Sequence, residues 1–156
     1  MKEFDRWNGR KKKIDGKKSL VDFHEREMWW CAIGVNVGSE QHSQSEDFGR
    51  PVVVMRRFTR DTFLAVPLTT KVRTAPFRVR FMVNGVENDA LVLQMRVYDR
   101  RRLLRKVGMV AQDTFAELQK EVASAIQTTD PACAGSSEAE ANVYAHDSKT
   151  GLQVKR

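Results

Sequence analysis

The sequence predicts a mainly β fold with flanking helices (α+β), namely a small SH3-like barrel with a C-terminal helix and an N-terminal helical extension. Two observations predict it. Short apolar runs separated by turn residues follow one another between residues 28 and 110, which is typical of small antiparallel barrels. Apolar residues recur at helical intervals only before and after these runs. Consecutive strands with a helix across one opening fit a barrel better than a parallel α/β sheet.

The first element is a helix in a basic N-terminal extension over residues 1–25. Phe4, Trp7, Ile14 and Leu20 are spaced loosely as on one helical face, among many lysines. This pattern predicts an amphipathic helix with a basic face.

Apolar and β-branched runs then predict six strands. They lie at residues 28–35, 51–58, 62–68, 76–83, 90–98 and 106–110. The polar stretch 39–49 predicts a long exposed loop that ends at Arg50. In 76–83, apolar side chains alternate with Arg78 and Arg80, so one face of this strand lies in the core and the other is wet and cationic. Asn84 and Gly85 predict the turn that follows.

A last helix is predicted to begin at Gln112 or Asp113, because Phe115, Leu118 and later apolar residues recur at helical intervals. From residue 128 onward, small and polar residues predict a disordered tail over 128–156. The predicted organisation is thus the extension over 1–25, a barrel domain over 26–127 and the tail.

Composition and charge limit the classes of function that the chain can have. The chain has 156 residues and a net charge of +7, which favours polyanionic partners only modestly. No apolar run is long enough for a membrane span, so we expect a soluble, cytoplasmic protein. Cys31 and Cys133 lack the spacing of a zinc site or a disulfide framework. The acidic residues near Glu25 and Glu46 are interpreted as solvated carboxylates, so no metal site and no cofactor is predicted.

A phosphate-binding site is suggested by Arg50, Thr69, Thr70 and Lys71. An arginine offers a planar fork that matches two phosphoryl oxygens, and threonine hydroxyls can complete the cradle. Loop capping and ordinary solubility explain the same residues, and composition alone favours this explanation. On the residues alone, both interpretations remain open.

Three segments settle the interpretation when they are taken together. They are WWCAIGVNVGSEQ leading to GRPVVV, then VPLTTK, then LQMRVYDRRRLLRKVG before the last helix. In this order and with this spacing they resemble the PemK/MazF family of toxin endoribonucleases (mRNA interferases) of type II toxin–antitoxin systems. The resemblance covers residues 26–126. It implies an SH3-like barrel of the CcdB/MazF/PemK kind that works as a homodimer.

The resemblance implies a toxin that cleaves single-stranded RNA, in particular mRNA, at short sequence motifs without a metal or other cofactor. The implied reaction is attack of a ribose 2′-hydroxyl on the adjacent phosphorus, which leaves a 2′,3′-cyclic phosphate and a 5′-hydroxyl end. The implied protein partners are a cognate antitoxin, which neutralises the toxin, and a second copy of the chain.

By position in the motifs, the resemblance assigns the catalytic roles to Arg50, which precedes Pro51, and to Thr69. Because the unperturbed pKa of arginine is above ~12, Arg50 is a poor base, and Glu40 or His42 is the candidate acid or base. The RNA-binding residues that we expect are Gly38, Ser39, Gln41, Thr70, Lys71, Arg78, Arg80 and Arg96.

The sequence departs from the family pattern in the long stretch 42–49 before Arg50, and in the N-terminal extension. The extension is expected to pack on the barrel, with an antitoxin or RNA surface and dimer contacts through Phe4 and Trp7 as alternatives. Two other functions stay open: a catalytically inactive nucleic-acid-binding or regulatory barrel, and a CcdB-like gyrase poison. The presence of Arg50 and Thr69 argues against the first. Trp29, Trp30 and Phe48 are interpreted as core or base-stacking residues, and the core interpretation is preferred for the two tryptophans.

Overall fold

The computed structural model describes residues 3–18, 20–43 and 45–127. By its contacts the chain divides into Met1–Ala125 and Ile126–Arg156, and the tail predicted over 128–156 lies outside the described residues. The elements are α1 (Phe4–Asp15), β1 (Glu27–Ala32), β2 (Gly49–Arg57), β3 (Thr62–Thr69), β4 (Arg78–Val83), β5 (Val86–Leu91), η1 (Val92–Gln94), β6 (Arg96–Asp99), η2 (Arg100–Arg102), β7 (Leu103–Met109) and α2 (Gln112–Gln127).

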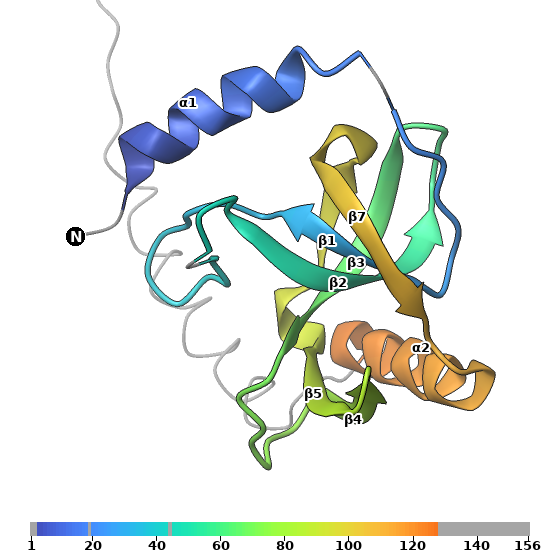
Figure 1. The fold of residues 1–156 in the computed structure, drawn as a ribbon. Helices are drawn as coiled ribbons and strands as arrows, with labels where there is room; N and C mark the ends of the chain where they lie inside the picture. The colour runs from blue at the N-terminus through green and yellow to red at the C-terminus, as the bar shows by residue number, and fades with distance from the viewer. Residues whose placement is uncertain (1–2, 19, 44, 128–156) are drawn as a thin grey trace, which may run out of the picture. The chain divides into compact units, whose positions relative to one another are not determined.

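The strands form one curled antiparallel sheet in the order β4-β5-β3-β2-β1-β7, and β6 also pairs with β3. Helices precede and follow the strands in the chain (Figure 1). This mainly β architecture with an N-terminal and a C-terminal helix confirms the predicted fold class.

Strand β3 organises the sheet, because one of its edges has two partners. Its C-terminal end pairs with β5, where Leu68 lies opposite Ala90. Its N-terminal half pairs with β6, where Phe63 lies opposite Tyr98. The other edge of β3 pairs with β2.

The prediction of a single strand over 90–98 is wrong. The short 3-10 helix η1 interrupts it, and its first residue, Val92, is fully buried. The Val92 amide donates to Phe77 O (3.2 Å), and the Met95 amide closes the turn by donating to Val92 O (3.0 Å). This break lets the two halves of the stretch pair with different parts of β3.

The turn predicted between β4 and β5 is confirmed. Asn84 and Gly85 have φ values of 50° and 78°, and Val83 pairs with Val86 across the turn. Two consecutive residues with positive φ are typical of a type I′ hairpin, which asparagine and glycine adopt at low cost.

Apolar side chains pack in two main clusters. One lies beneath α2 and includes Val66, Val79 and the helix residues Phe115 and Leu118, so the predicted helical spacing is confirmed. The other surrounds Phe23 and Phe63, whose ring centroids are 4.8 Å apart.

A third, smaller cluster joins α1 to the sheet. Trp7 packs there with Ala32, Val35 and Phe48, whereas Phe4 remains 47% exposed. The expectation that the extension packs on the barrel is therefore confirmed for Trp7. No helix in the described part of the chain is long and apolar enough to cross a membrane.

Candidate active site

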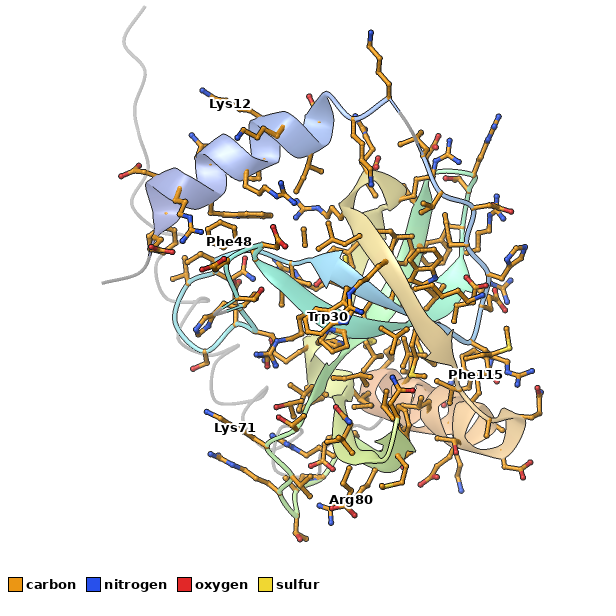
Figure 2. The ribbon with its side chains drawn as sticks, viewed as in Figure 1. Lys12, Trp30, Phe48, Lys71, Arg80 and Phe115 are labelled. Atoms are coloured by element: carbon orange, nitrogen blue, oxygen red, sulfur yellow. The ribbon has the colours of Figure 1, made fainter. Side chains whose placement is uncertain are left out.

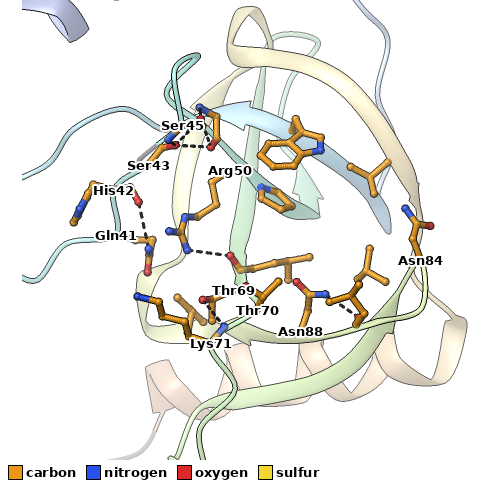
Figure 3. Close-up of a pocket in the computed structure, with 18 of the residues that line it drawn as sticks. Gln41, His42, Ser43, Ser45, Arg50, Thr69, Thr70, Lys71, Asn84 and Asn88 are labelled. Atoms are coloured by element: carbon orange, nitrogen blue, oxygen red, sulfur yellow. Dashed lines mark hydrogen bonds between the residues drawn. The ribbon is translucent and has the colours of Figure 1, made fainter. Parts of the chain in front are cut away.

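A groove of about 790 Å³ brings together residues from distant parts of the sequence. They come from β1, the loop before β2, the beginning of β2, the end of β3 and the residues after it, the β4–β5 hairpin and β7 (Figure 3). Of the predicted site residues, the groove contains Gln41, His42, Arg50, Thr69, Thr70, Lys71 and Arg78.

Arg50 is half-buried at the beginning of β2. Its Nη1 donates to the carbonyl of Leu68 at 3.2 Å. With the Gln41 amide in the orientation that matches donors to acceptors, its oxygen accepts from Nη1 at 2.8 Å and from Nη2 at 3.0 Å. Within the described residues, none of the salt bridges involves Arg50. Burial lowers the pKa of the guanidinium, but arginine stays protonated in proteins.

Thr69 is the last residue of β3, and it lines the groove. Thr69 Oγ1 accepts from the Lys71 amide at 3.2 Å, which leaves the hydroxyl proton for another acceptor. Thr70 and Lys71 follow as exposed residues. This part of the groove therefore brings a hydroxyl donor together with the cations Arg50 and Lys71.

A buried carboxylate organises the cationic face that was predicted for 76–83. Asp89 is 1% exposed and accepts from Arg73 N (2.8 Å), Arg80 Nε (3.0 Å) and Arg78 Nη1 (3.3 Å). Burial alone would raise the pKa of Asp89, but these hydrogen bonds more than offset it, so the pKa lies below its ordinary value. Arg78 lines the groove and Arg80 does not, although both reach the same carboxylate.

Other predicted residues lie elsewhere. Gly38 and Ser39 are exposed in the loop but do not line the groove. Glu40 also stays outside it, and its carboxylate accepts from the Val37 amide at 3.3 Å. Arg96 lines a separate pocket beside α1. Of the two candidate acid or base residues, only His42 lies in the groove.

Sequence reasoning missed Arg105 and Lys106 as lining residues, and it preferred the core for Trp30, which also lines the groove. Trp29 is buried as interpreted, but Trp30 is partly exposed, so the core interpretation of Trp30 is wrong (Figure 2). The Arg105 guanidinium lies 5.2 Å from the centroid of the Trp30 ring. Strand alternation could have indicated that Trp30 faces away from the core, because adjacent residues in a strand, here Trp29 and Trp30, point to opposite faces.

The fold and the groove define a class: a small, curled β-sheet protein with a groove lined by cationic side chains. The family model described as PemK-like, MazF-like toxin of type II toxin–antitoxin system matches residues 24–126. The chain belongs to this family, and the resemblance drawn from the three sequence segments is confirmed.

Solved structures share the fold. MazF from Deinococcus radiodurans has 20% sequence identity and a TM-score of 0.55, with 71% of this chain and 100% of that chain covered. An endoribonuclease from a mycobacterial species has 18% identity and a TM-score of 0.54, with 73% and 100% covered. An endoribonuclease crystallised with its cognate antitoxin, also mycobacterial, has 18% identity and a TM-score of 0.53, with 69% and 97% covered. A comparison with curated proteins gives no match.

Proposed function

We propose that this chain is the toxin of a type II toxin–antitoxin system and that it cleaves single-stranded RNA by itself, without a metal. The observation that carries the proposal is the half-buried Arg50, whose contacts are the neutral oxygens of Leu68 and Gln41. A desolvated cation without a carboxylate partner attracts a phosphate strongly. Family membership supports RNA as the source of that phosphate.

Arg50 would stabilise the transition state. When the ribose 2′-oxygen attacks the adjacent phosphorus, negative charge grows on the non-bridging oxygens, and preorganised donors lower the barrier most where charge develops. The contacts with Leu68 and Gln41 already hold the Arg50 side chain, so little reorganisation is needed. Thr69 would donate its hydroxyl proton to a second non-bridging oxygen.

Two protons move in this reaction. The 2′-hydroxyl proton would pass to His42, which lines the groove, rather than to Glu40, whose carboxylate bonds the loop backbone. As the bond between phosphorus and the 5′-oxygen breaks, that oxygen takes up a proton from a solvent water, and the balance is restored when His42 releases the proton it accepted. The products are a 2′,3′-cyclic phosphate and a 5′-hydroxyl end, and no water is consumed in this step.

The rest of the groove suits a single strand. Lys71 and Arg78 supply positive charge for neighbouring phosphates. Trp30 with Arg105 supplies the combination of an aromatic ring and a guanidinium, on which unpaired bases stack. A duplex hides its base faces, so these residues favour single-stranded RNA.

The test is incubation of purified protein with a long single-stranded RNA in EDTA, followed by mapping of the cut ends. We expect cuts at a short motif, with 5′-hydroxyl ends that a kinase labels without prior phosphatase treatment. Arg50→Ala and Thr69→Ala should each reduce cleavage by about 100-fold or more. Arg56→Ala, on the same strand as Arg50 and with a 69% exposed side chain, is the matched control.

Cleavage that requires Mg²⁺, or that survives in Arg50→Ala, would contradict the proposed mechanism. RNA binding without cleavage by a folded wild-type protein would favour a regulatory barrel instead.

The antitoxin and the homodimer are part of the same proposal. One related endoribonuclease has been crystallised with its cognate antitoxin, and we infer that this chain has such a partner, which blocks the groove. Light scattering of the purified chain tests the homodimer. Protection from cleavage by an antitoxin encoded beside it tests the partner, and an antitoxin that binds without inhibiting would contradict the blocked groove.

A further inference from the structure

Helix α1 contacts the segment that leads into Arg50. The helix lies outside the part of the chain that matches the family model, which begins at residue 24. The segment, residues 45–49, belongs to the long stretch before Arg50. Trp7 of α1 is 5% exposed and packs on Phe48 with ring centroids 5.3 Å apart. The two unusual parts of this sequence are therefore packed against each other.

Two arginines of α1 hold the same segment. Arg6 Nη2 donates to the carbonyl of Glu46 at 3.2 Å, and its guanidinium lies 5.3 Å from the Phe48 ring centroid. Arg10 forms an ion pair with Asp47 at 3.6 Å. The helix thus contacts Glu46 through a backbone hydrogen bond, Asp47 through an ion pair and Phe48 through its ring.

The end of this segment is fixed to the beginning of β2. Ser45 Oγ accepts from the Gly49 amide at 2.9 Å and donates to the Gly49 carbonyl at 3.0 Å. Ser43 Oγ donates to the same carbonyl at 2.5 Å. Because Arg50 follows Gly49 directly, a shift of the segment moves the backbone that carries the guanidinium.

Phe48 needs this support, because its φ of 55° lies in the left-handed region, which costs a non-glycine residue about 1–3 kcal/mol. Its carbonyl accepts from the Gly34 amide at 3.2 Å. Trp7 covers Gly34 so closely that a Cβ there would lie 2.0 Å from the indole. Trp7 therefore holds both ends of that hydrogen bond in place.

We propose that α1 is a positioning element of the active site: Trp7, Arg6 and Arg10 hold residues 45–49 and thereby place Arg50 for cleavage. This inference rests on the proposed function. Misplacing a catalytic group by about 1 Å can cost up to about 100-fold in rate. Loosening α1 therefore slows the chemical step, whereas RNA affinity, to which Lys71 and Arg78 contribute, changes little.

The experiment compares Trp7→Ala with the conservative Trp7→Phe and with Phe4→Ala, a change on the same helix at a 47% exposed residue. The measurements are kcat and KM for RNA cleavage, affinity for an uncleavable oligonucleotide with 2′-deoxy sugars, and amide exchange at Phe48 and Gly49. Trp7→Ala should lower kcat about 10- to 100-fold, leave KM and affinity within about 3-fold, and speed the exchange. Trp7→Phe should restore most of kcat, and Phe4→Ala should match wild type.

An unchanged kcat in folded Trp7→Ala would overturn the proposal, because α1 would then only add stability. Equal losses in kcat and in oligonucleotide affinity would overturn it as well, since the groove itself would have been disturbed. If Trp7→Ala does not fold, Arg6→Gln with Arg10→Gln tests the same contacts, because these side chains are 52% and 33% exposed. A wild type that does not cleave RNA refutes the proposed function instead, and exchange at Gly49 then decides whether α1 holds the segment.

Discussion

Two arginines of the groove have opposite surroundings. Arg78 Nη1 lies 3.3 Å from a carboxylate oxygen of Asp89, which is buried and also binds Arg80. Arg50 contacts the neutral oxygens of Leu68 and Gln41. The charge of Arg78 is thus partly offset inside the protein, whereas no carboxylate among the described residues pairs with Arg50.

This difference separates arginines that order the structure from arginines that are available to a ligand. A carboxylate partner fixes a guanidinium but weakens its field toward a phosphate, whereas neutral acceptors fix it and leave its charge intact. A count of basic residues cannot separate the two kinds of arginine. The difference depends on whether a residue on the neighbouring strand is acidic and buried.

The largest effect is expected for Asp89→Ala. The change removes the partner of Arg78, Arg80 and the Arg73 amide, so the free energy of unfolding should fall by about 3 kcal/mol. Urea denaturation measures it. Asp15→Ala is the matched control: its side chain is 81% exposed in an ion pair with Arg101, whose side chain is 37% exposed, and the loss there should stay below about 1 kcal/mol. Equal losses of unfolding free energy in the two variants would show that the buried carboxylate contributes no more than the exposed one.

Arg50→Lys should come next, with cleavage reduced about 100-fold and the free energy of unfolding changed by less than about 0.5 kcal/mol. Lysine keeps the charge but cannot present two parallel donors. Single-turnover cleavage at saturating RNA, with thermal unfolding alongside, checks both values. A loss of stability similar to that of Asp89→Ala would mean that Arg50 is structural.

Acid should remove the contribution of Asp89. Its pKa in the folded protein is lowered, so the stabilisation is complete above the unfolded-state value of about 3.9 and is lost as the pH falls through the folded-state value. The difference in unfolding free energy between wild type and Asp89→Asn should therefore shrink below about pH 4. Urea titrations at several pH values measure it, and a difference that grows in acid would reverse the assigned sign.

The smallest effect separates two cations of the groove. Lys71→Gln should reduce the slope of log affinity against log salt by about 1, because the described residues include no ion pair of Lys71. Arg78→Gln should reduce it by less, since Asp89 already offsets this charge. The measurement is binding of an uncleavable oligonucleotide at several salt concentrations, and equal changes in slope would show that Asp89 does not weaken Arg78.

Local signals in the sequence predicted much of the fold. Asn84 and Gly85 predicted their hairpin because the required backbone conformation is a property of those two residues. The stretch 90–98 was mispredicted because its β-branched and apolar residues fit one continuous strand. The break at Val92 depends on a hydrogen bond to Phe77, which is distant in sequence.

The candidate site was predicted in the same uneven way. Arg50, Thr69 and Lys71 were found because they stand in short motifs, and the structure places them in one groove. Asp89 was not, because no neighbouring residue in the sequence marks its role. Asp89 acts through arginines of the adjacent strand, a pairing that only the register of β4 and β5 defines.

The wide spread of the groove along the chain has a consequence for biosynthesis. Its lining runs from Trp30 to Val107, and its last wall is part of β7, which pairs with β1. A nascent chain that still lacks β7 cannot complete the groove, however much of β2 and β3 has left the ribosome. The groove of this chain is therefore incomplete until nearly the whole domain has been made.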